Sequence, residues 1–198
     1  MSRATAFEHF DLRTITPQPW KNGAGWTREL AFGGASSTAF DWRVSVAEVD
    51  RDAPFSAFPG VDRCIALLHG AGMRLHSADG SIDHALTEAL VPFAFPGELP
   101  LTATLVDGAS RDFNVMTRRG AFRSELLCHR AAAALTAGDV TLLLCCDGEW
   151  AIAAGAAPLN LGAMQALLWR TPVDSIDARP LGAAGTLLQV RLCHDRPL

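Results

Sequence analysis

The chain has 198 residues, of which 49% are hydrophobic, and a formal net charge of −4 at pH 7. This length corresponds to one large domain or two small ones, and the composition is sufficient for a buried core. The acidic balance argues against a nucleic-acid-binding protein, whose surface is usually basic. The longest apolar run in the middle of the chain, 142–146, is far too short to span a membrane, and the N-terminal residues lack the apolar segment of a secretory signal. We therefore expect a cytoplasmic protein with no nucleic-acid or membrane partner.

The first unusual stretch is WKNGAGWTREL at residues 20–30. It places two Trp among Gly, Asn, Thr and charged side chains. Polar loops are common, but they seldom set indole rings beside Lys, Arg and Glu. The stretch is therefore either a buried structural corner or one wall of a binding site.

The following residues read mostly as short β-strands. Residues 41–49 (DWRVSVAEV) and 111–118 (RDFNVMTR) alternate between apolar and polar side chains, which is the period of a strand. Asp-Gly pairs at 79–80 and 147–148 are flanked by strand-like runs and predict hairpins, because Gly supplies the positive φ that tight turns need. Many short strands separated by Gly and Pro are typical of a sandwich or a barrel.

Two stretches are ambiguous. Residues 124–135 and 161–169 carry Ala and Leu at spacings that also suit helices, and propensity alone does not decide between helix and strand. The segment 120–130 follows a dense polar run and is a candidate junction between two halves of the chain.

The five cysteines give no evidence of a disulfide framework or a metal site. Their number is odd and none forms a C-x-x-C pair. We expect them to be small, buried side chains in a reducing compartment. They are Cys64, Cys128, Cys145, Cys146 and Cys193.

Arginines on successive predicted strands are the strongest indication of a site. Arg43 and Ser45 lie on one face of a strand whose other face carries Trp and Val, and Arg63 follows a turn. That polar face is either solvated or turned into a barrel. A guanidinium group fits a carboxylate with two parallel hydrogen bonds, so a barrel with several inward arginines would select a small acid.

Five motifs in this order resemble the HutD/Ves family. They are WKNGAGWTREL, DWRVSVAEV, PFSAFPGVDRCIALLHGAG, DHALTEALVPFAF and RDFNVMTR, and the resemblance runs from about Phe10 to Arg119. The usual opening motif of the family has Gly where this chain has Ala24. Alanine lacks the freedom of Gly at positive φ, so a slightly different loop shape is expected there.

The resemblance implies an all-β fold, namely a cupin-type double-stranded β-helix or jelly roll that is duplicated as a bicupin. One barrel would comprise residues 1–119 and the other 120–198, with an approximate boundary and with exchange of strands allowed. The ambiguous Ala- and Leu-rich stretches would then be strands or short turns. The second barrel would either cover the first or form a homodimer interface, and the sequence does not choose between these roles.

The function that the resemblance implies is non-catalytic binding of a small carboxylate. Such a protein would regulate histidine utilisation or a stress-related pathway by binding an intermediate such as formylglutamate, formiminoglutamate or urocanate. Expected ligand contacts and neighbouring polar residues are Lys21, Asn22, Thr27, Arg28, Arg43, Ser45, Arg63 and Asn114. Alternatively, Glu29 and Asp112 neutralise these arginines as internal ion pairs that hold the barrel together without a ligand.

A metal-independent enzyme, an isomerase or hydrolase acting on a small acid, is the alternative function. Its acid and base would come from Glu29, Asp112, His76 and His84. No catalytic residue is assigned, because the chain has no G-x-S-x-G motif and no cysteine in an activating context. We expect no metal and no other cofactor, since the chain lacks the H-x-H pair of metal-binding cupins and Arg74 would share a strand face with His76.

Overall fold

The computed structural model describes residues 6–20, 22–155 and 157–195, and every regular element in these ranges is a β-strand. The expected all-β fold is confirmed. The two Ala- and Leu-rich stretches form strands β12 (Phe122–His129), β13 (Ala133–Leu135), β16 (Leu159–Gly162) and β17 (Gln165–Trp169). Packing on a pleated surface overrides the helix propensity of Ala and Leu here. None of the described residues belongs to a helix long and apolar enough to cross a membrane.

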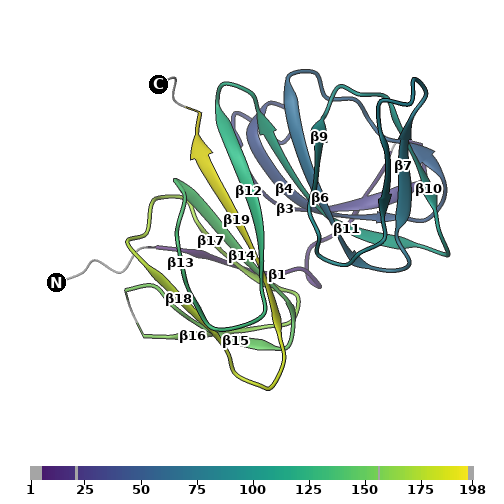
Figure 1. The fold of residues 1–198 in the computed structure, drawn as a ribbon. Helices are drawn as coiled ribbons and strands as arrows, with labels where there is room; N and C mark the ends of the chain where they lie inside the picture. Colours follow the sequence, from purple (N-terminus) through teal and green to yellow (C-terminus); the bar gives the residue numbers. More distant parts are fainter. Residues whose placement is uncertain (1–5, 21, 156, 196–198) are drawn as a thin grey trace. The chain divides into compact units, whose positions relative to one another are not determined.

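The chain divides into two compact units, each made of two antiparallel sheets. The first barrel comprises the described residues between 15 and 122, and the second comprises residues 6–14 together with the described residues between 123 and 195. Figure 1 shows the two facing sheets of each unit. The boundary in the middle of the chain lies close to the junction expected from the sequence.

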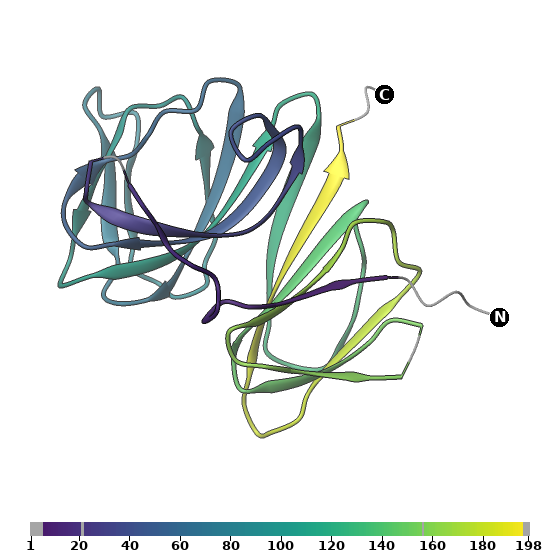
Figure 2. The ribbon, with the colours of Figure 1, turned by 180° about the vertical axis from the view of Figure 1, so that it is seen from behind.

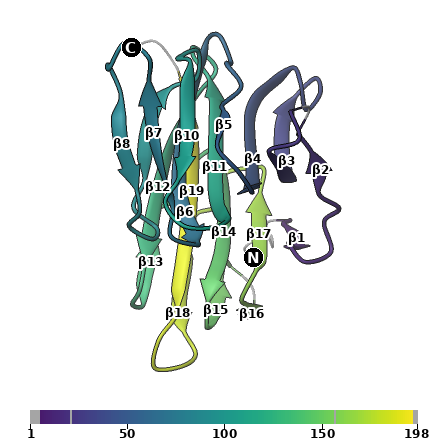
Figure 3. The same cartoon turned by 90° about the vertical axis from the view of Figure 1, so that its right-hand side faces the viewer.

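The first barrel pairs a six-stranded sheet with a four-stranded sheet. The larger sheet has the order β2 (Gln18–Pro19), β3 (Gly25–Gly34), β4 (Phe40–Val49), β11 (Ser110–Arg118), β6 (Val61–His69) and β9 (Phe93–Pro96). The smaller sheet has the order β5 (Ala53–Pro54), β10 (Leu101–Leu105), β7 (Met73–Ser77) and β8 (Asp83–Leu86), and Figure 3 shows these four strands side by side. A cluster of buried apolar side chains, including Leu67, Leu75 and Phe95, fills the space between the sheets.

The second barrel has a five-stranded and a four-stranded sheet. The first has the order β1 (Glu8–Asp11), β17, β14 (Val140–Asp147), β19 (Thr186–His194) and β12. The second has the order β13, β18 (Ile176–Pro180), β15 (Glu149–Ala153) and β16. Trp150 and Trp169 are almost completely buried in its core cluster.

The sequence assigned residues 1–119 to the first barrel with exchange of strands allowed, and strand β1 is such an exchanged strand, because it lies in the second barrel. It pairs antiparallel with β17, from Glu8 opposite Leu168 to Asp11 opposite Gln165, and Figure 2 shows the purple strand beside the green strands of that unit. Its four residues carry no signal for this partner, because backbone hydrogen bonds supply the pairing.

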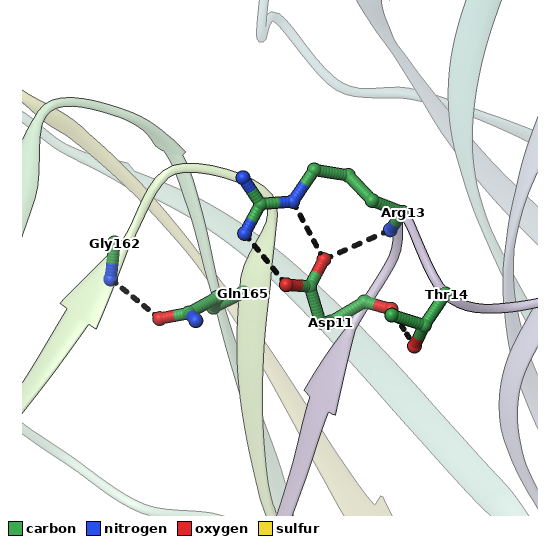
Figure 4. Close-up of polar contacts among 5 residues, drawn as sticks. All are labelled: Asp11, Arg13, Thr14, Gly162 and Gln165. Carbon is green, nitrogen blue, oxygen red and sulfur yellow. Dashed lines mark hydrogen bonds and ion pairs between the residues drawn. The ribbon is translucent and has the colours of Figure 1, made fainter.

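A compact turn ends β1 at Asp11 (Figure 4). The Asp11 carboxylate accepts hydrogen bonds from Nε and Nη2 of Arg13 at 2.8 and 2.6 Å, and its carbonyl oxygen accepts one from Thr14 Oγ1 at 2.9 Å. On β17, Gln165 Oε1 accepts a hydrogen bond from the Gly162 amide at 2.9 Å. The Arg13 guanidinium lowers the pKa of Asp11 to about 2, so the turn keeps its charge pair at neutral pH.

The two Asp-Gly turns flanked by strand-like runs behave differently. At 79–80 the chain folds back as predicted, since β7 pairs with β8. At 147–148 the hairpin prediction was wrong, because β14 pairs with β17 and β19 whereas β15 pairs with β16 and β18. An Asp-Gly turn reverses the chain, but it does not specify that the flanking strands become neighbours. Here it carries the chain from one sheet of the barrel to the other.

The cysteines are all unpaired, with Cys145 buried and the other four partly buried. Burial raises the pKa of Cys64 to about 11 and that of Cys146 to about 12. These two groups are therefore thiols at neutral pH, and thiols are poor nucleophiles.

Candidate functional site

A cavity of about 500 Å³ lies within the first barrel. Polar side chains from the β2–β3 segment, β4, β6 and β11 line it together with the aromatic segment 55–58. The polar lining residues are Asn22, Thr27, Thr38, Arg43, Ser56, Arg63, Asp112 and Asn114. Its volume falls within the range of small-molecule sites, and a mixture of aromatic and converging polar groups is typical of them.

Strand register places the two arginines of this cavity at the same level. Met116 on β11 is opposite Arg43 on β4 and opposite Arg63 on β6. One register step of two residues further along, Asn114 lies opposite Ser45 and Ile65. Because residues two apart point to the same face of a strand, β11 presents Met116, Asn114 and Asp112 in successive layers of the barrel interior.

Arg43 is held between aromatic rings and has few polar partners. Its Cζ lies 4.9 Å from the centre of the Phe40 ring and 5.4 Å from that of Phe58. Its Nη1 donates a 3.4 Å hydrogen bond to the Ser37 carbonyl, and its Nη2 lies 3.0 Å from the Met116 sulfur. These contacts position the guanidinium without neutralising its charge.

Arg63 is more deeply enclosed, with 8% of its surface exposed. Its Cζ lies 5.0 Å from the ring centre of Phe55, 5.8 Å from Phe58 and 5.1 Å from Phe95. Burial, followed by repulsion from Arg43, lowers the pKa of Arg63 to about 10. The group therefore keeps its positive charge at neutral pH, although its surroundings disfavour that charge.

The ion-pair alternative is not seen in the described part of the chain. No salt bridge joins Arg43 to Glu29 or Arg63 to Asp112, although each carboxylate favours the charged form of its arginine. Asp112 is 2% exposed, and among the described residues the only hydrogen bond to its carboxyl group is a 3.2 Å contact from Ser110 Oγ to Oδ1. Burial raises the pKa of Asp112 to about 7, with Ser110 and the Arg63 charge acting in the opposite direction.

This raised pKa predicts a pH dependence of stability. A carboxyl group whose pKa is higher in the folded chain stabilises the fold at low pH, and that contribution is lost as the pH rises from about 4 through about 7. The Asp112→Asn variant, which cannot ionise, should therefore gain stability relative to the parent by at least about 1 kcal/mol between pH 5 and pH 8. Thermal unfolding of both proteins at the two pH values measures this. A constant difference between them would contradict the prediction.

The structure places five of the expected site residues in the cavity wall and leaves two others outside it. Those in the wall are Asn22, Thr27, Arg43, Arg63 and Asn114. Ser45 is buried beside Asn114 but is not part of the wall. Arg28 points to the opposite face of the sheet from Thr27, where its Nη1 contacts Glu48 Oε1 at 2.5 Å, because neighbouring residues of a strand alternate. Lys21 lies outside the described residues.

Three aromatic residues of the cavity wall were not among the site residues expected from the sequence. Trp20, Phe55 and Phe58 line the cavity, and the latter two lie over Arg63. The motif PFSAFPG contained this signal, since its two Phe lie only eight and five positions before Arg63 in the sequence. Asp112 was considered as a partner of an arginine and as an acid–base candidate, but not as a ligand contact.

The opening stretch 20–30 forms one edge of the cavity. Trp20 Nε1 donates a 2.7 Å hydrogen bond to Thr27 Oγ1, and the Trp20 ring packs edge-on against Phe55 at 6.3 Å. Asn22 Oδ1 accepts a 3.1 Å hydrogen bond from the Ala24 amide. The indole thus anchors the wall, and the polar side chains stabilise the loop around it.

In this loop glycine is required at position 25 but not at the preceding position 24. Gly25 needs its hydrogen because a Cβ there would lie 2.2 Å from the Glu48 carbonyl oxygen. Ala24 is buried but does not have a positive φ, whereas Gly23 does, at 67°. The Ala at position 24 therefore needs no special backbone conformation.

Substituting Gly25 with Ala should destabilise the first barrel. The added methyl group meets backbone atoms of β4 that cannot rotate away, so the two strands must separate. We expect a loss of about 1–3 kcal/mol in the free energy of unfolding, measured by denaturant titration. Gly80→Ala is a poor control because Gly80 has a positive φ, so Ala24→Gly, which adds no volume, is the matched comparison.

The cavity has the wrong donors for a metal ion. None of the described His or Cys side chains lines it, and the described residues contain no group of three or more His, Cys, Asp or Glu that could hold one. His76 contacts Thr104 at 3.3 Å, and His84 stacks on Phe93 at 3.8 Å, both outside the cavity wall. Of the four acid–base candidates proposed from the sequence, Asp112 alone lines the cavity.

The profile of the HutD family matches residues 12–187, which is most of the chain. The chain belongs to the HutD family. It is 43% identical over 112 residues to Protein Ves of Escherichia fergusonii, and this match covers 56% of the chain and 58% of Ves. The chain thus spans somewhat over half the length of this curated relative.

Solved structures agree with the family assignment and with the fold. A conserved protein of unknown function from Pseudomonas aeruginosa PAO1 has a TM-score of 0.86 at 31% identity, with 96% of this chain and 100% of that chain covered. HutD from Pseudomonas fluorescens SBW25 has a TM-score of 0.83 at 26% identity with the same coverage. A cupin 2 conserved barrel protein from Leptotrichia buccalis, 11% identical over 93% of this chain and 95% of that one, has a TM-score of 0.57. The family resemblance and the expected cupin fold are both confirmed.

Proposed function

We propose that this HutD-family protein binds a small carboxylate in the cavity of its first barrel without transforming it. The observation that carries this proposal is the pair of guanidinium groups, Arg43 and Arg63, which line one cavity without a salt bridge to any described carboxylate. A partly desolvated cation with no protein counter-ion gains most from an anionic ligand.

The surroundings of the two arginines suit a planar carboxylate in particular. Aromatic rings lie over their faces and partly shield them from water, which strengthens the remaining electrostatic interactions. Asn114 is 6% exposed and its Oδ1 has no hydrogen-bond partner among the described residues, so its amide can orient a ligand. Thr27 and Asn22 add polar groups at the edge of the same cavity.

The family suggests the biological context. We propose that the ligand is an intermediate of histidine utilisation, such as formylglutamate, formiminoglutamate or urocanate, or a related acid in a stress response. All of them carry carboxylates. The HutD of Pseudomonas fluorescens has been solved in a formate condition, and formate is the smallest carboxylate. In this proposal the protein acts in the cytoplasm, as a duplicated cupin that forms a homodimer.

A ligand screen tests the proposal. A thermal-shift experiment with urocanate, formiminoglutamate, formylglutamate and glutamate should give a rise in apparent melting temperature with at least one acid. Isothermal titration then gives its affinity, and Arg43→Ala should weaken it. The absence of a shift with all four acids would reject the proposal. An acid that binds the Arg43→Ala variant as tightly as the parent would reject the role of this arginine.

Metal-independent catalysis on such an acid is the second candidate, and Asp112 is the observation that favours it. A carboxyl group with a pKa of about 7 in a ligand-sized cavity is suited to general acid–base chemistry near neutral pH. NMR spectra of the bound acid recorded over several hours distinguish the candidates. New resonances that fail to form with Asp112→Asn would favour an enzyme, and unchanged spectra favour a binding protein.

A further inference from the structure

We propose that Asp112 makes the site selective for carboxylates that also carry an N–H donor, so that simple acids of the same length bind more weakly. This inference rests on the proposed function and specifies its ligand class as amino, amido or amidino acids. Asp112 lines the same cavity as the two arginines, and it lies two register steps along β11 from their level.

The position of Asp112 on β11 sets the length of a ligand that could contact both this residue and the arginines. Met116, which marks the level of both arginines, and Asp112 are four residues apart on β11, or roughly 13 Å between their Cα atoms. Asn114 lies between them on the same face. No ion pair joins either arginine to Asp112 among the described residues, so a ligand that contacts both has to extend along β11.

The two carboxylate oxygens of Asp112 differ in their hydrogen bonds. Its Oδ2 is buried and accepts no hydrogen bond from another described group, while Oδ1 accepts one from Ser110. A buried acceptor without a donor is costly, and the cost rises when the group is charged. A ligand N–H pointing at Oδ2 would remove this cost. A carbonyl or carboxylate oxygen at the same place would face an ionised Asp112 and be repelled.

The groups around Asp112 include positively charged and apolar side chains. Arg63 on β6 and Arg43 on β4 are positive, and Glu29 on β3 acts on Arg43. The opposite sheet contributes apolar side chains, among them Leu75, Leu101 and Ala103. Asp112 is therefore the negative end of a cavity whose other end is positive, which matches an elongated ligand with a carboxylate at one end and a donor at the other. Because its pKa is about 7, this polarity is fully developed above neutral pH.

Matched ligand pairs test the inference at pH 8. The pairs are glutamate with glutarate, and N-acetylglutamate with 2-acetoxyglutarate, in which oxygen replaces the N–H group. Isothermal titration should show that the N–H member of a pair binds about tenfold more tightly or better. This preference should shrink at pH 6, where Asp112 is protonated.

The decisive variant is Asp112→Asn, which keeps the shape and removes the charge. We expect the affinity ratio within a pair to fall to about one, chiefly because the donor-free member gains affinity. A purely structural role of Asp112 would change both affinities together and leave the ratio unchanged. Asp62→Asn is the matched control, since Asp62 is an exposed residue that contacts Arg119 Nε at 2.7 Å, and it should keep the parent ratio.

The outcomes separate this inference from the proposed function. Equal affinities within the pairs at pH 8, or an Asp112→Asn ratio equal to that of the parent, would overturn the selectivity of Asp112 and leave carboxylate binding intact. If none of the acids in the ligand screen or in the matched pairs binds, carboxylate binding itself is overturned, and the selectivity falls with it.

Discussion

Replacing Arg63 with Met should reduce the affinity for the carboxylate ligand by about 100-fold while leaving the melting temperature of the free protein unchanged or higher. Charge-assisted hydrogen bonds contribute about 1.5–3 kcal/mol each, and every 1.4 kcal/mol is a factor of ten. The stability of the free protein should not fall, because Arg63 is buried without a salt bridge to any residue in the described part of the chain, and Met offers a similar volume with no charge to desolvate.

Titration calorimetry and thermal unfolding of the same variant measure the two effects. The matched control is Arg74→Met, because Arg74 is an exposed arginine on β7 that pairs with Asp83. It should bind ligand like the parent. A variant of Arg63 that unfolds more easily but still binds the acid would mean that this arginine supports the barrel and does not hold the ligand.

Truncating Trp150 to Ala should have the largest effect on stability. Trp150 is completely buried in the core of the second barrel, where it packs in one cluster with Trp169 and Leu161. Removal of a buried Trp side chain leaves a cavity and typically costs about 3–5 kcal/mol. For a chain of this size that corresponds to a melting temperature lower by about 10 °C.

Calorimetry of the Trp150→Ala variant measures this loss directly, and Trp26→Ala is the matched control. Trp26 is 41% exposed, so its removal should cost about 1 kcal/mol or less. Similar losses for the two substitutions would contradict the assignment of Trp150 to the core.

Much of the first barrel could be predicted locally. The alternation in 41–49 and 111–118 predicted strands, which the structure confirms as parts of β4 and β11. The same alternation predicted that Arg43 and Ser45 share a face, and both point away from the face of Trp42 and Val44. Strand periodicity is a local property, so the sequence carries it in full.

Other features of the site could not be predicted locally. Arg28 was grouped with the site because it lies in the opening motif, but one residue along a strand reverses the direction of a side chain, and Thr27 takes the inward position. The register that sets Arg43 and Arg63 on either side of Met116 joins residues 73 and 53 positions apart in the chain. No short stretch contains that information.

The sequence by itself determined the all-β class, the alternating strands, the family and the presence of arginines on successive strands. The tertiary structure decided which arginines share a cavity, that β1 joins the second barrel, that residues 147–148 link two sheets and that Asp112 lines the cavity with one oxygen that accepts no hydrogen bond from another described residue. The physical reason is the range of the interactions. Side-chain alternation depends on neighbours in the sequence, whereas register, enclosure and the pKa of a buried carboxyl depend on groups that only folding brings together.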